Sequence, residues 1–149
     1  MTHKIALIPG DGIGTAVVDA AMQVAEKAAP GLLVPTRFDW SCDTYLKTGR
    51  MMPEDGIETL RGFDAIFLGA VGWPAKVPDA VSLHGLLLPI RKAFVQYANI
   101  RPHRLLPGVQ GPLRKEGFDI LCIRENTEGE YSGAGGRVHE GQRPAVLPL

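Results

Sequence analysis

The chain has 149 residues, 45% of them hydrophobic and 21% charged, a composition that favours a packed core over a disordered chain. Its 16 Lys and Arg residues match its 16 Asp and Glu residues, which argues against binding to nucleic acid or a membrane surface. No apolar run approaches the roughly 20 residues of a membrane span. The segment Met1–Ala6 does not resemble a signal peptide, and the distant Cys42 and Cys122 fit a reducing compartment. We therefore expect a soluble, cytoplasmic protein.

Strands and helices are predicted to alternate along the first half of the chain. Short apolar runs that end at turns predict buried strands at Lys4–Ile8 and Phe63–Leu68, with a third strand at Leu32–Trp40. Pro35 suits an edge position in that third strand. Between the strands, helices are predicted at Ile13–Ala29, Asp43–Lys47 and Pro53–Arg61. The apolar stripe predicted for the first helix comprises Val17, Val18, Ala21, Val24, Ala25 and Ala28. This alternation predicts an α/β fold with a parallel or mixed sheet and flanking helices.

The second half begins with a predicted loop at Gly69–Ala80. Ser82 is a plausible N-cap for a helix from Leu83 to about Tyr97, in which Pro89 predicts a kink or an earlier end. Two further strands are predicted, at Asn99–Leu106 and Phe118–Ile123.

The glycines between Gly10 and Gly14 follow a predicted strand and precede a predicted helix. A dinucleotide-binding fingerprint would need its third glycine one position later, where Thr15 stands, and a phosphate-binding loop would need Gly-Lys-Ser/Thr. The residues alone therefore favour a tight turn that requires glycine backbones.

Three arginines and a tyrosine are candidates for a binding site. Arg91 lies late in an apolar helix, Arg101 on a strand, and Arg124 at the end of a strand. If they converge, they suit a substrate with two carboxylates, because a guanidinium binds a carboxylate through two hydrogen bonds. The alternative is that each lies on the surface or pairs with a nearby glutamate. Tyr131 fits either an acid–base role or a ring packed at a domain edge.

The sequence gives no basis for a metal site. The four histidines have no ligand spacing; they are His3, His84, His103 and His139. The acidic cluster of Glu125, Glu128 and Glu130 fits a solvated loop better than a cation site.

Five segments in order resemble the isocitrate and isopropylmalate dehydrogenase family of metal-dependent β-decarboxylating dehydrogenases, within it most closely the tartrate and D-malate dehydrogenase branch. The Gly-Ala-Val-Gly-Trp-Pro run and Met51-Met52-Pro53 point to that branch. The match extends along nearly the whole chain up to about Glu140. The segments are Ile8–Gly14, Phe63–Pro74, Ile90–Phe94, Asn99–Pro102 and Arg124–Tyr131.

The resemblance implies a role for several residues. Arg91, Arg101 and Arg124 match the arginines that bind the substrate carboxylates, and Tyr131 matches the tyrosine that protonates the enolate carbon after decarboxylation. Leu87 falls near the position that senses the variable group of the substrate. The resemblance also implies oxidation of a small 2-hydroxy diacid such as D-malate, tartrate or 3-isopropylmalate, with NAD and Mg or Mn as cofactors. It implies a homodimer as well. No residue of this chain is assigned to the metal, because the base lysine and the metal-binding aspartates belong to the second half of family members.

The resemblance implies an isopropylmalate-dehydrogenase-like fold that is incomplete in this chain. We expect residues 1–98 to form part of a first α/β domain, residues 99–140 to begin a second domain, and residues 141–149 to form a divergent tail. Full-length family members are more than twice as long, so we expect a truncated, inactive portion. The alternative is a non-catalytic fragment, or a regulatory partner that docks on a full-length relative.

Overall fold

The computed structural model describes residues 1–111, 113, 117–138 and 145–147. The chain forms two compact units, Met1–Ile90 and Arg91–Leu149, and each is described by itself. The division falls within helix α5 (Leu88–Ala93), whereas the sequence predicted a domain change after residue 98. That boundary concerns the domains of the complete family fold, so it stays a prediction. Within the described ranges, no helix is both long and apolar enough to cross a membrane.

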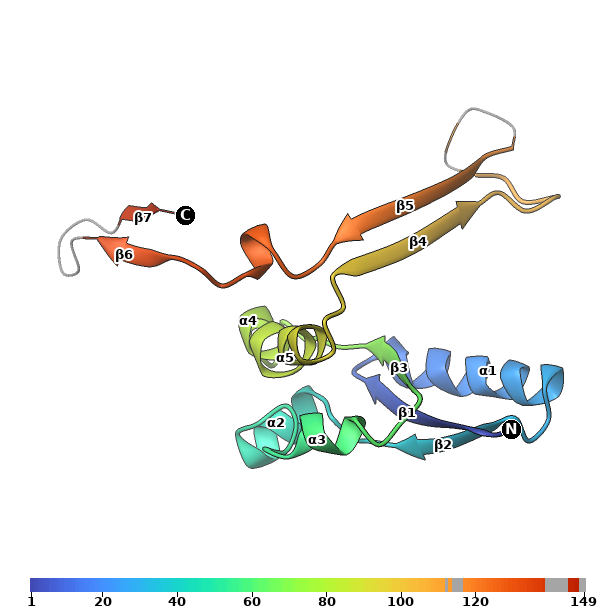
Figure 1. Cartoon of the computed structure of the whole chain (residues 1–149), viewed down its shortest axis with the longest axis horizontal. Helices are drawn as coiled ribbons and strands as arrows, with labels where there is room; N and C mark the ends of the chain where they lie inside the picture. Colours follow the sequence, from blue (N-terminus) through green and yellow to red (C-terminus); the bar gives the residue numbers. More distant parts are fainter. Residues whose placement is uncertain (112, 114–116, 139–144, 148–149) are drawn as a thin grey trace. The chain divides into compact units, whose positions relative to one another are not determined.

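The first unit is built on a three-stranded parallel sheet (Figure 1). Its central strand β1 (His3–Gly10) pairs in parallel with β2 (Leu33–Arg37) on one side and β3 (Ala65–Ala70) on the other. All three strands lie within two residues of their predicted starts. The predicted α/β class with a parallel sheet is therefore confirmed, and Pro35 lies on a strand at the edge of the described sheet, as predicted.

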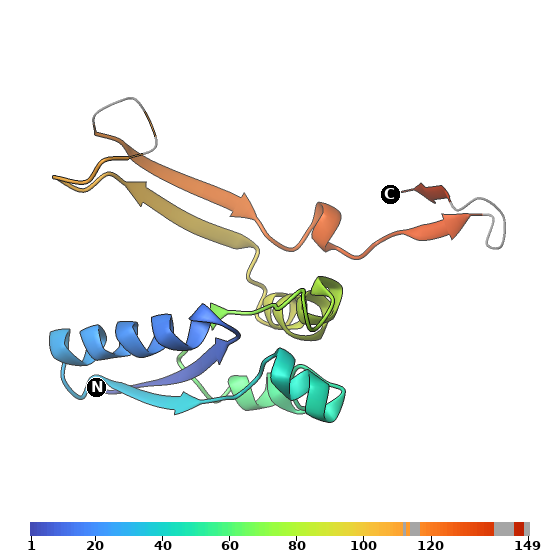
Figure 2. The same ribbon diagram turned by 180° about the vertical axis from the view of Figure 1, so that it is seen from behind.

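Helix α1 (Ile13–Ala28) covers one face of this sheet (Figures 1 and 2). Its Val18 packs with Ile5 and Leu7 of β1 in a buried cluster. The predicted apolar stripe is correct in part: Val18 is buried and Ala21 and Ala25 are partly buried, whereas Val17 and Val24 are 50% and 68% exposed. The buried residues of α1 are Gly14 and Val18. Gly14 lies so close to Ala70 of β3 that a Cβ atom would not fit, and this contact turns the Gly14 side of the helix toward the sheet. The residues around this cluster are Met22, Leu33 and Phe67.

Two short helices follow β2. Helix α2 (Cys42–Thr48) begins at Ser41, whose hydroxyl oxygen accepts a hydrogen bond from the Thr44 N–H at 3.3 Å, and Gly49 ends it in the left-handed conformation. Helix α3 (Gly56–Leu60) is shorter than the predicted Pro53–Arg61. The main-chain N–H of Gly56 donates to the carbonyl of Pro53, so the residues before Gly56 form a turn rather than a first helical turn.

A helical run follows the loop after β3. It comprises α4 (Asp79–Ser82), a π-helical segment η1 (Leu83–Leu87) and α5. The prediction that Ser82 caps the helix is wrong: Ser82 is buried inside the run, and its hydroxyl donates to the Asp79 carbonyl at 3.0 Å. Pro89 lacks the N–H that would bond to the Gly85 carbonyl, and the wider π-helical turn just before it accommodates this missing bond.

In its described ranges, the second unit contains two antiparallel strand pairs. Strands β4 (Ala98–Arg104) and β5 (Asp119–Glu125) form a hairpin close to the predicted ranges. After the short helix η2 (Gly129–Tyr131), β6 (Gly136–Val138) pairs with β7 (Ala145–Leu147), which lies in the predicted divergent tail. Of the histidines, His139 lies outside the described residues.

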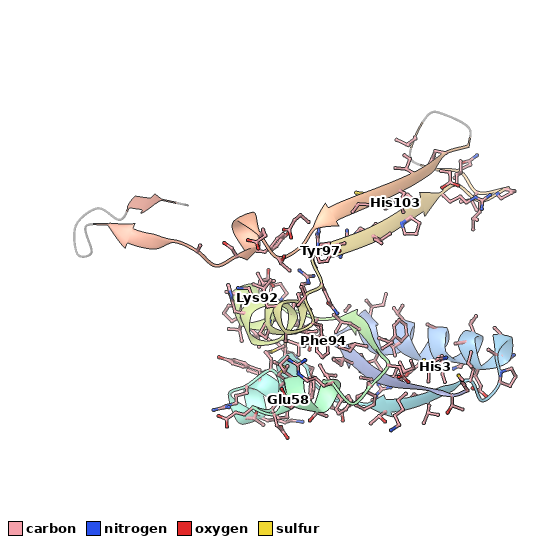
Figure 3. The ribbon with its side chains drawn as sticks, viewed as in Figure 1. His3, Glu58, Lys92, Phe94, Tyr97 and His103 are labelled. Carbon is pink, nitrogen blue, oxygen red and sulfur yellow. The ribbon has the colours of Figure 1, made fainter. Side chains whose placement is uncertain are left out.

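One face of the β4–β5 hairpin is apolar and exposed; its side chains are drawn in Figure 3. Ile100 pairs with Ile123, and Pro102 with Leu121. Ile100, Leu121 and Ile123 are 62%, 61% and 66% exposed. A two-stranded ribbon is marginally stable by itself, and this apolar face is uncovered in the described part of the chain.

The turn that follows helix α5 contains a strained residue, Val95. The Gln96 N–H donates to the Arg91 carbonyl at 2.9 Å and the Val95 N–H to the Lys92 carbonyl at 3.2 Å. This closure places Val95 in the left-handed region, with φ of 52°. A β-branched residue is disfavoured there, and helices usually place glycine at such a position.

We expect the Val95→Gly substitution to raise the free energy of unfolding by about 0.5–1 kcal/mol, since relief of the left-handed strain exceeds the entropy that glycine costs. Urea denaturation of the purified protein measures this change. The matched control is Val109→Gly in the exposed loop between β4 and β5, where φ is not positive and no strain is relieved. An equal effect of both substitutions would contradict the assignment of strain to Val95.

Candidate functional site

The three predicted arginines all belong to the second unit. Arg91 lies in α5, Arg101 on β4 and Arg124 near the end of β5. In the hairpin register Asn99 stands opposite Arg124, and Arg101 stands opposite Cys122. Side chains of opposed residues project from the same face, so Arg101 and Arg124 share one face of the hairpin as diagonal neighbours.

Arg91 lies close enough to Arg101, Arg124 and Tyr131 for their charges to change its pKa. Burial lowers the pKa of the Arg91 guanidinium, and the positive charges of Arg124 and Arg101 lower it further. Tyr131 acts in the opposite direction on the same pKa. A bound anion would relieve this repulsion among like charges, so the arrangement suits a ligand with negative groups.

Arg124 is held by two neighbours. Its Nη2 donates to the Asn126 side-chain oxygen at 2.7 Å, and its guanidinium carbon lies 5.6 Å from the centre of the Tyr131 ring. Its Nε is buried and has no hydrogen-bond acceptor within the described part of the chain. The sequence reasoning missed Asn126; the signal available was its place two residues after Arg124 in Arg-Glu-Asn-Thr-Glu-Gly-Glu-Tyr.

Tyr131 is partly buried at the end of η2. Its main-chain N–H donates to the Glu128 carbonyl at 3.2 Å. The next residue is tied to α5, because Lys92 Nζ donates to the Ser132 carbonyl at 2.8 Å; Lys92 is labelled in Figure 3. A hollow of about 400 Å³ lies among the same segments, and its lining residues are Lys92, Val95, Thr127, Glu128 and Ser132. The structure thus brings Tyr131 together with the arginine cluster.

Glu125, the last residue of β5, accepts the hydrogen bonds that shape the loop after this strand. Partial desolvation acts to raise the pKa of the Glu125 carboxyl, but hydrogen bonds from the main-chain N–H groups of Thr127 and Glu128 and from the Thr127 hydroxyl lower it to about 2. Glu125 therefore stays ionised and fixes the turn that leads to Tyr131. Across the described ranges, no three side chains of His, Cys, Asp or Glu gather as metal ligands.

Leu87 belongs to the first unit. It is the last residue of the π-helical segment η1, and its side chain is partly buried. The three arginines belong to the second unit, so the role of Leu87 in specificity stays a prediction.

The glycine turn of the first unit is a structural element, as the residues alone predicted. Gly10 and Gly12 have φ of 75° and 54°. A Cβ atom on Gly14 would lie 2.1 Å from the Pro9 carbonyl oxygen and 2.7 Å from the Ala70 nitrogen. The turn therefore needs glycine both for its backbone conformation and for its close approach to β3.

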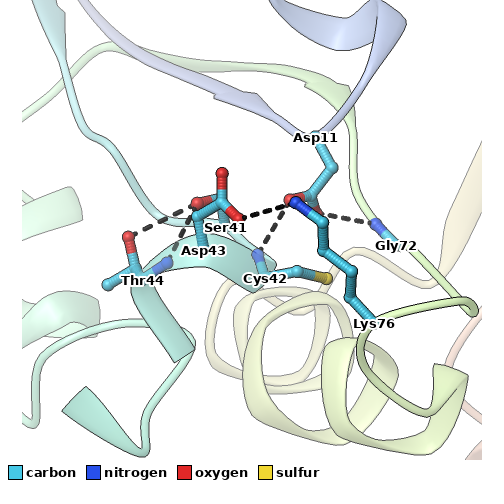
Figure 4. Close-up of polar contacts among 7 residues, drawn as sticks. All are labelled: Asp11, Ser41, Cys42, Asp43, Thr44, Gly72 and Lys76. Atoms are coloured by element: carbon cyan, nitrogen blue, oxygen red, sulfur yellow. Dashed lines mark hydrogen bonds and ion pairs between the residues drawn. The ribbon is translucent and has the colours of Figure 1, made fainter. Parts of the chain in front are cut away.

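The sequence reasoning also missed Asp11, which joins three segments of this unit (Figure 4). Asp11 is 6% exposed, and its carboxylate accepts hydrogen bonds from the main-chain N–H groups of Cys42 at 2.9 Å and Gly72 at 3.0 Å. Burial raises the pKa of the Cys42 thiol, and Asp11 raises it further, so Cys42 is not an activated nucleophile.

Comparison with known proteins gives relatives that are much longer than this chain. The chain is 54% identical over 153 residues to the tartrate dehydrogenase/decarboxylase of Pseudomonas putida, and this match covers 98% of the chain and 42% of the relative. It is 50% identical over 153 residues to the decarboxylating D-malate dehydrogenase of Escherichia coli, with the same coverage. The chain thus spans about 40% of the length of the curated relatives that it matches.

Solved structures with the same fold include a β-decarboxylating dehydrogenase from Thermococcus kodakarensis, with 32% identity and a TM-score of 0.66 over 99% of the chain and 40% of that protein. The isocitrate dehydrogenase of Methylococcus capsulatus is 26% identical, with a TM-score of 0.80 over 99% of the chain and 42% of that protein. The sequence profile of the isocitrate/isopropylmalate dehydrogenase family matches residues 4–146. This chain therefore belongs to the isocitrate/isopropylmalate dehydrogenase family.

Proposed function

We propose that the complete protein containing this chain oxidises a small 2-hydroxy diacid of the D-malate or tartrate type with NAD and a divalent metal, and then decarboxylates the product. The observation that carries the proposal is the clustering of Arg91, Arg101 and Arg124 around Tyr131 in the second unit. Two relatives named for tartrate and D-malate support the choice of diacid.

The arginines are proposed to bind the carboxylates of the substrate and to orient the substrate. A guanidinium binds a carboxylate through two parallel hydrogen bonds, and such bonds are strong because both partners are charged. Burial is the main cause of the lowered pKa of Arg91, and the positive charges of Arg124 and Arg101 lower it further. Two substrate carboxylates would neutralise most of this charge and would fix the orientation of the carbon between them.

Tyr131 supplies a proton donor beside this cluster. In the proposed reaction its hydroxyl protonates the carbon from which carbon dioxide has left. The adjacent Arg124 packs on the face of the tyrosine ring, which fixes the hydroxyl relative to the bound carboxylates. This division of labour assigns binding to the arginines and proton transfer to Tyr131.

The cofactors bring the remaining chemistry. When bound, NAD would accept the hydride and a Mg or Mn ion would polarise the carbonyl that forms. In the family that this chain resembles, the metal-binding aspartates belong to the second half of the protein, so we assign the metal ligands to that half. The homodimer implied by the family also stays a prediction, which size-exclusion chromatography with light scattering would test.

The experiment is to measure NADH formation in the presence of Mn with D-malate, tartrate and 3-isopropylmalate. The complete protein and the 149-residue chain are assayed in parallel, and a thermal melt is recorded for each. We expect turnover of at least one diacid by the complete protein and none by the shorter chain.

Absence of turnover by a complete protein that melts cooperatively would overturn the proposed function. Turnover by the 149-residue chain would show instead that its own residues suffice, and the assignment of the metal ligands elsewhere would be wrong.

A further inference from the structure

We propose that Asn126 is a positioning residue, which holds the guanidinium of Arg124 in the orientation that binds a substrate carboxylate. The proposal rests on the proposed function, and it assigns a role to a side chain that would itself not touch the substrate. It follows from the burial of Asn126 and from its two hydrogen bonds.

Asn126 connects Arg124 to the end of helix α5. It is 3% exposed, its Oδ1 accepts from Arg124 Nη2 at 2.7 Å, and its Nδ2 donates to the main-chain carbonyl of Gln96 at 3.2 Å. Among the described residues, Asn126 accepts from the Nη2 of Arg124, whereas the buried Nε of Arg124 has no acceptor. The direction of the Arg124 guanidinium therefore depends on Asn126 and on the Tyr131 ring.

The chemistry of this position requires an amide. One side chain must present an acceptor to Arg124 and a donor to the Gln96 carbonyl at the same time, and the short carboxamide of Asn126 does both. An aspartate would keep the acceptor but would lose the donor. It would also add a negative charge that competes with the substrate for Arg124. A neutral amide orients the guanidinium and leaves its charge available for an anion.

The support behind Asn126 is itself rigid. The Gln96 N–H donates to the Arg91 carbonyl at 2.9 Å, and the preceding Val95 adopts its left-handed conformation to make that closure. The carbonyl that receives Asn126 Nδ2 is thus fixed by the end of α5, the helix that also carries Arg91. Asn126 thereby connects the Arg124 side chain to the main chain after α5, which is hydrogen-bonded to Arg91.

The test is a double-mutant cycle in the complete enzyme. We expect Asn126→Ala to raise the KM for the diacid about 10- to 100-fold, the range associated with loss of a hydrogen bond to a charged group, and to leave the KM for NAD within about twofold. In an Arg124→Ala background, Asn126→Ala should change the diacid KM less than about twofold, since its effect acts through Arg124. Asn126→Asp should raise the diacid KM at least as much as Asn126→Ala. The control is Gln110→Ala, which removes an exposed carboxamide from the loop after β4 and should change neither constant.

A second readout does not depend on activity. The Nη2–Hη2 resonances of Arg124, identified by their loss in Arg124→Lys, should exchange slowly with solvent in the wild type and rapidly in Asn126→Ala, since Nη2 donates to Asn126. Equal effects of Asn126→Ala in both backgrounds, or unchanged Arg124 resonances, would overturn the positioning role. If the wild-type enzyme oxidises no diacid, the proposed function fails, and the resonances alone then decide whether Asn126 holds Arg124.

Discussion

The Tyr131→Phe substitution is expected to lower the kcat of the complete enzyme by about 10²–10⁴-fold, the usual contribution of a positioned proton donor. The ring remains, so its contact with the Arg124 guanidinium at 5.6 Å should persist. The KM for the diacid should therefore change little. Steady-state kinetics with the best diacid and saturating NAD measure both constants.

Tyr97→Phe is the matched control for this prediction. Tyr97 lies just before β4 and is 64% exposed, so removal of its hydroxyl should leave kcat unchanged. If Tyr131→Phe retains the wild-type kcat, another group protonates the carbon, and the role proposed for Tyr131 is wrong. A higher KM with unchanged kcat would point instead to a role in substrate binding.

The Gly14→Ala substitution should destabilise the protein by about 3 kcal/mol or more, in the range of severe overpacking. The new methyl group would lie 2.1 Å from the Pro9 carbonyl oxygen and 2.7 Å from the Ala70 nitrogen, and both are main-chain atoms that cannot rotate away. Helix α1 would have to move off β3, which would also disturb the contact of Val18 with Ile5 and Leu7. Urea denaturation of the complete protein measures the loss.

Gly12→Ala provides the comparison within the same turn. Nothing lies within 4 Å of a Cβ atom at Gly12, but its φ of 54° and ψ of −121° form a conformation that L-residues rarely adopt, at a cost of about 1–3 kcal/mol. A loss at Gly12 equal to that at Gly14 would show that backbone conformation, rather than close packing, makes the turn depend on glycine.

The parallel sheet could be predicted because its strands are short apolar runs that end at turns. The exposure of Val17 and Val24 on helix α1 could not be predicted, since the helix approaches β3 at Gly14, and that contact is invisible along the sequence. Ser82 had the chemistry of an N-cap, but the helix had already begun at Asp79. Local sequence patterns thus predicted where the helices and strands lie. Contacts between distant residues determine where these elements end and which of their faces are buried.

For the candidate site, too, the sequence predicted some features and the structure was needed for others. The residues alone left each arginine open to a surface role, and the family resemblance singled out Arg91, Arg101 and Arg124. The structure adds their clustering, which depends on the strand register that sets Asn99 opposite Arg124. The support given by Asn126 required coordinates, because its two bonds reach residues 2 and 30 positions away.

The buried carboxylate of Asp11 limits which substitutions the positions around it can tolerate. Its partners at Cys42 and Gly72 contribute main-chain N–H groups, which every amino acid except proline supplies. The side chain at position 42 is buried beside the Asp11 carboxylate, so it must be small and uncharged, whereas the φ of 124° at Gly72 confines that position to glycine. Sequence drift in this unit should therefore leave Asp11 and Gly72 fixed, while small buried residues replace one another at Cys42.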